Sequence, residues 1–242
     1  MSLIAAWAGV VAGLLIWWMF VRRLTTKPWE VQAGHAGIEA GEVFRAESAR
    51  VGLWVFLGVA TALFGLFITA YLIRRAPHIG AGATLQDWRP VDDPQVLWIN
   101  SALLVAGSVA MQWARTSMAH GRVAHARQGL WLGGAFAIAF LLGQSFAWQQ
   151  LRDAGYYAAS NPANAFFYVL TAVHALHVIG GLIVWSRATY RLRPGAVVLG
   201  RTQLTVELCT VYWHFLLAVW LLLFGAMGWL SPDFVRLVCG TR

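Results

Sequence analysis

The stretch AFFYVLTAVHALHVIGGLIVWS, residues 165–186, decides the fold class, because it runs for 22 residues without an Asp, Glu, Lys or Arg. At a helical rise of about 1.5 Å per residue, roughly 20 apolar residues cross a hydrocarbon core of about 30 Å. The bilayer interior offers no water to backbone N–H and C=O groups, so a single apolar segment crosses it as a helix. The stretch therefore predicts a transmembrane α-helix.

Further apolar stretches of similar length lie at 3–21, 51–73, 96–114, 129–151 and 207–231. The 242 residues are 59% hydrophobic and 12% charged, a composition that is atypical of a soluble domain. The net charge of +8 lies in the gaps between these stretches, which favours membrane anchoring over nucleic-acid binding. We predict an all-α, polytopic membrane bundle of six transmembrane helices. Residues 1–49 would form an N-terminal helix and a cytoplasmic loop, and residues 50–242 a five-helix bundle.

The loops differ in basic residues, and cytoplasmic loops carry the excess of Lys and Arg. Residues 22–50, 115–128 and 187–206 contain twelve of the 18 basic residues, and the segments on the other side contain six. This asymmetry predicts that both termini lie outside the cytoplasm. It also places the segment 24–49 in the cytoplasm, where its glycines predict a loop with at most a short surface helix.

A group of polar residues lies inside the last two predicted spans, where polar side chains are costly and need partners. The group comprises Thr171, His174, His177, Glu207, Tyr212 and His214. Opposite helix directions bring His177 and His214 to similar depths, so we expect these two histidines to form one hydrogen-bonded cluster with Glu207. A haem or copper site is the alternative interpretation. It is disfavoured because a haem needs opposed axial histidines and a cavity, so we expect no metal and no catalytic residue in this chain.

Three other residues are candidates for binding or packing. Asn100 and Gln144 are typical of hydrogen bonds between membrane helices. Arg50 opens the second span at the cytoplasmic interface, where a guanidinium can bind a lipid phosphate through paired hydrogen bonds. On composition alone, Arg50 could equally be an ordinary interfacial anchor.

Several motifs resemble the third core subunit of haem-copper respiratory oxidases, such as cytochrome c oxidase. RVGLWVFL at 50–57, WINSALLVAGSVAMQWA at 98–114 and GQSFAWQQL at 143–151 resemble three of its helices. The most specific motifs are FFYVLTAVHALHVIGG at 166–181 and ELCTVYWHF at 207–215, which resemble its last two helices. The resemblance extends from about Arg50 to Trp229.

The resemblance implies a non-catalytic subunit of the bacterial inner membrane that packs against oxidase subunit I, with subunit II in the same complex. Haem and copper are then expected in the partner subunits, and phospholipid in a cleft between two helix groups. The subunit would support proton uptake by its neighbour during oxygen reduction. Arg50 matches a lipid-facing arginine of the family, which favours the phosphate-binding interpretation, and the six polar residues match its buried polar cluster.

The sequence departs from the family at three acidic positions, which here are Ala60, Ala147 and Leu217. Proton conduction along those carboxylates is therefore not expected, and a structural, lipid-holding role remains. A related subunit of a nitric oxide reductase or quinol oxidase is one alternative. A proton-coupled transporter is another, disfavoured because no proline interrupts a predicted span.

Overall fold

The computed structural model describes residues 37–75, 95–193 and 199–228, which form five long α-helices. The helices are α2 (Gly37–Arg75), α4 (Gln95–Ala119), α5 (Val123–Asp153), α6 (Pro162–Arg191) and α7 (Leu199–Gly228). Each contains a segment long and apolar enough to cross a membrane. The predicted all-helical membrane architecture is thus confirmed for the described residues, whereas the predicted span at 3–21 lies outside them.

Helix α2 begins earlier than the sequence predicted. Residues 37–49, assigned above to a loop, are helical and continuous with the membrane segment Glu47–Arg75. Once the apolar span is helical, each added residue gains a backbone hydrogen bond, so good helix formers such as Glu39, Ala40 and Glu42 extend it despite Gly41. The predicted division at residue 49 therefore falls within one uninterrupted helix.

A tight connection joins α4 to α5 and makes them an antiparallel pair. Gly121 turns the chain with φ of +71°, a conformation that glycine adopts without steric cost. Gly129 lets the two backbones approach, since a Cβ there would lie 2.8 Å from the Ala110 carbonyl oxygen. Small residues at such crossings favour close helix packing in lipid.

The start of α6 is fixed by its first residues. Asn161 caps the helix, its side-chain oxygen accepting a hydrogen bond from the Ala163 N–H at 2.8 Å. Pro162 follows as the first helical residue, where its missing N–H leaves no bond unmade. The membrane segment therefore begins three residues before the predicted span at 165.

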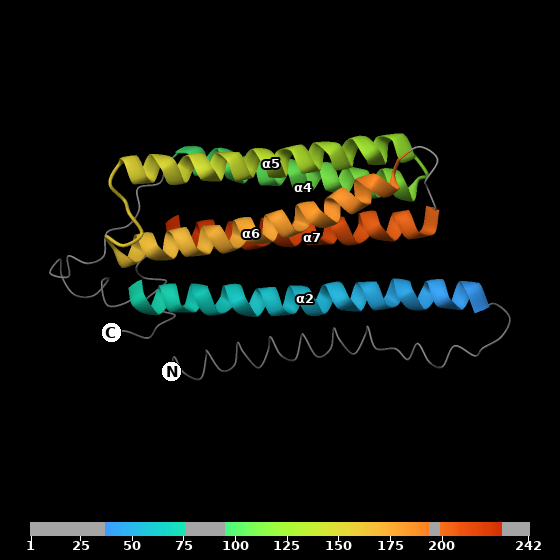
Figure 1. The fold of residues 1–242 in the computed structure, drawn as a ribbon, viewed down its shortest axis with the longest axis horizontal. Helices are drawn as coiled ribbons and strands as arrows, with labels where there is room; N and C mark the ends of the chain where they lie inside the picture. Colours follow the sequence, from blue (N-terminus) through green and yellow to red (C-terminus); the bar gives the residue numbers. More distant parts are fainter. Residues whose placement is uncertain (1–36, 76–94, 194–198, 229–242) are drawn as a thin grey trace.

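The helices lie roughly side by side, with α4 and α5 along one edge, α6 and α7 in the middle and α2 along the opposite edge (Figure 1). Helix α7 is central, because it packs on α4, α6 and α2. In the membrane segment of α7 half of the residues are buried, whereas in that of α2 only 17% are. Helix α2 packs mainly on α6 and α7. Helix α6 runs obliquely toward α5 at one end (Figure 1).

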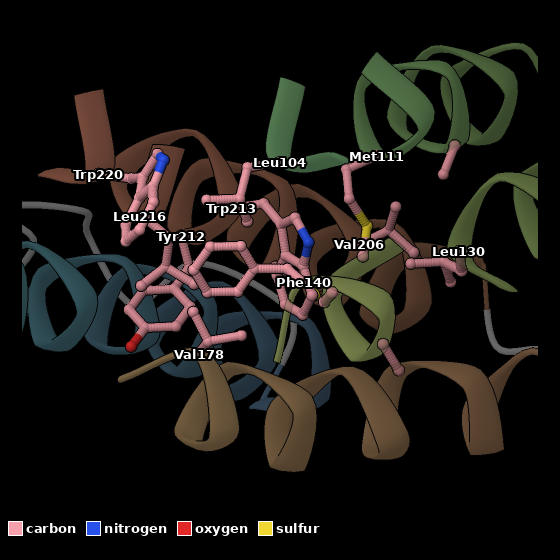
Figure 2. Packing of buried hydrophobic residues seen from close by; sticks show 14 of the residues in the cluster. Leu104, Met111, Leu130, Phe140, Val178, Val206, Tyr212, Trp213, Leu216 and Trp220 are labelled. Atoms are coloured by element: carbon pink, nitrogen blue, oxygen red, sulfur yellow. The ribbon is translucent and has the colours of Figure 1, made fainter. Parts of the chain in front are cut away.

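The core lies around the middle of α7. Figure 2 shows Tyr212, Trp213, Leu216 and Trp220 of this helix among side chains from its neighbours. Phe140 of α5 is fully buried and meets Trp220 edge to face, with ring centroids 4.9 Å apart. These aromatic contacts place α7 at a fixed rotation, and that rotation decides which way its polar residues point.

Basic residues gather at one end of the bundle, where α2, α5 and α7 begin and α4 and α6 end (Figure 1). We call this the arginine-rich end. Arg50, Arg115, Arg122, Arg127, Arg187, Arg191 and Arg193 lie there, and Arg74, Arg75 and Arg152 lie at the other end. The described helices therefore keep the charge asymmetry of the sequence.

Candidate functional site

Three charged side chains from different helices meet at the arginine-rich end. Arg50 of α2 bonds Glu207 Oε2 through Nη2 at 3.2 Å, and Arg115 of α4 lies 3.7 Å from Oε1 of the same carboxylate. This Glu207 ion cluster links α2, α4 and α7. Its side chains are 48%, 42% and 29% exposed for Arg50, Arg115 and Glu207, so solvent and salt screen the attraction. Two arginines against one glutamate leave a net positive charge, which could attract an anion.

His214 of α7 points toward α4. Its Nδ1 bonds the Ser108 hydroxyl, and its Nε2 lies 3.2 Å from the Gln112 side-chain oxygen. An amide oxygen only accepts, so Nε2 carries the proton and Nδ1 accepts the proton of Ser108. Both ring nitrogens of a neutral His214 are thereby satisfied by α4.

His177 has a different environment, on the side of α6 that faces α2. Its Nδ1 donates to the Val173 carbonyl of its own helix at 2.8 Å. Its ring lies against Phe56 and Phe64 of α2, with centroids 6.3 and 5.2 Å away. Tyr212 of α7 donates to the backbone carbonyl of His177 at 2.9 Å.

The predicted single cluster of His177, His214 and Glu207 is therefore wrong. Tyr212 and His214 are two positions apart in α7, so their side chains point in directions that differ by about 200° around the helix axis. Because Tyr212 faces α6, His214 faces α4. The prediction compared only the depths of the residues along their helices. It did not include the rotation of α7 about its own axis, which decides the direction of each side chain. Glu207 bonds arginines, and the two histidines bond different helices.

Two further buried polar residues of α6, Thr171 and His174, are each tied to a neighbouring helix. His174 is fully buried, and its Nε2 donates to the Leu216 carbonyl of α7 at 3.0 Å. Thr171 accepts a hydrogen bond from Trp148 Nε1 of α5 at 3.1 Å and donates to the Phe167 carbonyl. These contacts hold α6 against α7 and α5.

Asn100 and Gln144 meet between α4 and α5. Asn100 Nδ2 donates to Gln144 Oε1 at 3.2 Å, and both side chains are buried. Gly143 makes room for this pair, because a Cβ at that position would overlap the Asn100 side-chain oxygen.

Sequence reasoning missed the partners that α4 supplies. Ser108, Gln112 and Arg115 lie at spacings of four and three, so they share one face of the helix. That face meets His214 and Glu207 of α7. A polar stripe of this spacing in an otherwise apolar span was the signal available in the sequence.

The described residues contain no group of three or more His, Cys, Asp or Glu side chains placed to hold a metal ion. Cys209 is buried in the core. The three positions named above as departures from the resemblance hold apolar side chains: Ala60 and Ala147 are buried, and Leu217 is half-buried. The polar residues of the site are thus arranged mainly for contact between helices, and the arginine-rich end has an excess of positive charge.

Comparison with known proteins shows the family of the chain. The model of the family described as "Cytochrome c oxidase subunit III" matches residues 9–232. A cytochrome c oxidase subunit 3 of Synechocystis is 30% identical over 178 residues, covering 72% of each chain. One of Thermostichus vulcanus is 28% identical and covers 72% of this chain and 83% of its own length.

A third relative is a fused protein. The heme-copper oxidase subunit I+III of Aeropyrum pernix is 32% identical over 186 residues, which cover 75% of this chain and 22% of that longer protein. The family match extends over most of the chain and includes all five described helices. The protein is therefore a multi-pass membrane protein that belongs to the cytochrome c oxidase subunit III family and forms part of a respiratory oxidase complex.

Proposed function

We propose that the chain is the non-catalytic core subunit III of a haem-copper terminal oxidase in a bacterial inner membrane. In this proposal it packs against subunit I, in a complex with subunit II, and the partner subunits contain the haem and copper. The match over residues 9–232 carries the proposal, and the fused subunit I+III of Aeropyrum pernix supports contact with subunit I. The subunit would stabilise subunit I and support proton uptake during oxygen reduction.

The orientation that we propose places the arginine-rich end in the cytoplasm and both termini outside. The excess of arginines at this end supports the proposal, because the cytoplasmic loops of membrane proteins carry more Lys and Arg than the loops on the other side. The Glu207 ion cluster would then lie at the inner surface of the membrane.

We further propose that Arg50 binds a phospholipid phosphate at this surface. Arg50 uses one guanidinium nitrogen for Glu207, and a guanidinium carries five N–H donors. With Arg115 also beside Glu207, the cluster keeps a net positive charge next to the bilayer. An Arg fork suits a phosphate, whereas a lysine offers only a point charge.

An Arg50→Ala variant of the whole oxidase complex tests the lipid role. We expect less co-purifying phospholipid and faster loss of activity during turnover, with initial oxygen consumption unchanged. Arg50→Lys should restore only part of the lipid, because it keeps the charge and loses the fork. Arg122→Ala is the matched control, since Arg122 is an exposed arginine of the same end that lies in the α4–α5 turn. Unchanged lipid content in Arg50→Ala would refute this role.

A further inference from the structure

A second basic site lies at the arginine-rich end, between α5 and α6. A pocket of about 640 Å³ opens there, separate from the Glu207 ion cluster. Four arginines line it: Arg127 from the start of α5, Arg187 and Arg191 from the end of α6, and Arg193, two residues after that end. No acidic residue is among its lining. Such a concentration of guanidinium groups around one hollow favours an anionic ligand.

One wall of the pocket is aromatic and rigidly held. Trp185 of α6 donates through Nε1 to the Leu130 carbonyl of α5 at 2.6 Å. Its indole lies directly over Gly134, where any Cβ would overlap the ring. Trp131 meets Trp185 edge to face, with centroids 5.5 Å apart. The four arginines therefore line the same pocket as a preformed aromatic surface.

Two of the arginines have their positions set by neighbours. Arg191 donates to the Thr205 hydroxyl of α7 at 2.7 Å, and the Arg193 guanidinium lies 4.5 Å from the centre of the Tyr190 ring. Arg127 and Arg187 form no ion pair with any carboxylate among the described residues. Their charges are therefore available to an outside ligand.

The surroundings of the pocket indicate that the ligand is a lipid. Trp131 is 59% exposed and Tyr190 is 62% exposed, and such amphipathic rings favour the headgroup zone of a bilayer. Leu132 and Val184, next in sequence to the two pocket tryptophans, are also exposed, so apolar surface suited to acyl chains begins at the same level. A soluble anion would use the arginines and leave this apolar surface unused.

We propose that this pocket binds the phosphate-bearing headgroup of an anionic membrane phospholipid. The guanidinium groups of Arg127 and Arg187 bind the phosphate oxygens, and the glycerol and upper acyl chains lie on Trp131 and Trp185. The site is distinct from the lipid role proposed for Arg50, and either can fail without the other.

Lipid titration of the full-length chain by native mass spectrometry in mild detergent tests this proposal. An Arg50→Ala background removes the first proposed lipid site, so that the remaining binding can be counted. In that background we expect one tightly retained phosphatidylglycerol. The double variant Arg127→Gln/Arg187→Gln should bind it roughly 30-fold more weakly, at about fivefold per arginine. Trp131→Ala, a change at an exposed position, should also weaken retention.

Arg122→Gln is the control, because it removes a charge from the same end outside the pocket. It should leave binding unchanged, and an equal loss in this variant would show diffuse surface attraction and overturn the proposal. Phosphatidylcholine should bind more weakly than phosphatidylglycerol. Inorganic pyrophosphate should not displace the lipid at equal concentration, and displacement would assign the pocket to a soluble anion. Equal lipid retention in the double variant and its parent would also overturn the proposal.

Discussion

His214 of α7 and Ser108 of α4 are hydrogen-bonded across the interface of their helices, with Gln112 on the other nitrogen of the same imidazole. This contact connects two segments of chain 106 residues apart. In lipid, where the hydrophobic effect does not drive helices together, such polar contacts and close packing set how helices associate.

His214→Leu should therefore weaken the α4–α7 interface. Ser108 and Gln112 would lose their partner, and an unpaired buried polar group costs about 1–3 kcal/mol. We expect a lower thermal unfolding midpoint of the detergent-solubilised oxidase, with normal turnover of the complex that does assemble. His120→Leu is the matched control, since this exposed histidine follows the last residue of α4 and its ring bonds the Thr116 carbonyl in the last turn of that helix. A His214→Leu complex that assembled normally and lost proton pumping from the first turnover would identify a proton path instead.

Glu207→Gln should have a small, salt-dependent effect. The carboxylate holds two partly exposed arginines, and exposed ion pairs contribute about 0–1 kcal/mol. We expect a slight loss of thermal stability at low ionic strength that disappears in high salt. The comparison requires melting curves of both proteins at two salt concentrations. A large loss that persisted in high salt would show that the cluster acts as a buried, unscreened pair.

Gly143→Ala should disrupt the contact between α4 and α5. The added methyl group would overlap Asn100 and displace it from Gln144, and overpacking of this kind costs about 1–3 kcal/mol. Gly65→Ala on α2 is the control, because a Cβ there meets nothing within 4 Å. In a helix that exchange is neutral or stabilising by up to about 1 kcal/mol. Equal melting temperatures for the two variants would contradict this account of the α4–α5 packing.

The proposed orientation can be tested with single cysteines at the two ends of the bundle. Ala119 and Ala158 are exposed and lie at opposite ends of the α4–α5 pair. In a Cys239→Ser background, a membrane-impermeant maleimide should label Ala158→Cys in intact cells and Ala119→Cys only after permeabilisation. The reverse pattern would place the arginine-rich end outside the cytoplasm.

The positions of the described helices could be predicted because the membrane imposes one simple requirement on length and polarity. Five predicted spans fall within α2, α4, α5, α6 and α7, except that the last was extended to residue 231, beyond the described end of α7 at Gly228. The helices are longer than the spans, since a helix continues past the hydrocarbon boundary while its backbone bonds remain satisfied. Helix ends therefore depend on local capping, as at Asn161, more than on hydropathy.

The partners of the polar residues were harder to predict, because they depend on the rotation of each helix about its axis. Spacing and depth placed His177 and His214 at one level but did not distinguish the face of α7 toward α6 from the face toward α4. Large aromatic residues such as Trp213 and Trp220 set that rotation through three-dimensional packing. Asn100 and Gln144 illustrate the simpler case, in which two neighbouring antiparallel helices leave few choices of partner.

Mild-detergent isolation of the tagged full-length chain, followed by visible spectroscopy, metal analysis and identification of co-purifying proteins, tests the proposed role most directly. We predict that the chain isolates with a haem- and copper-containing oxidase subunit I and that the assembly consumes oxygen. The same chain expressed without its partners should be colourless. A stoichiometric haem band in the isolated chain, or its purification without any haem-copper subunit, would contradict the account.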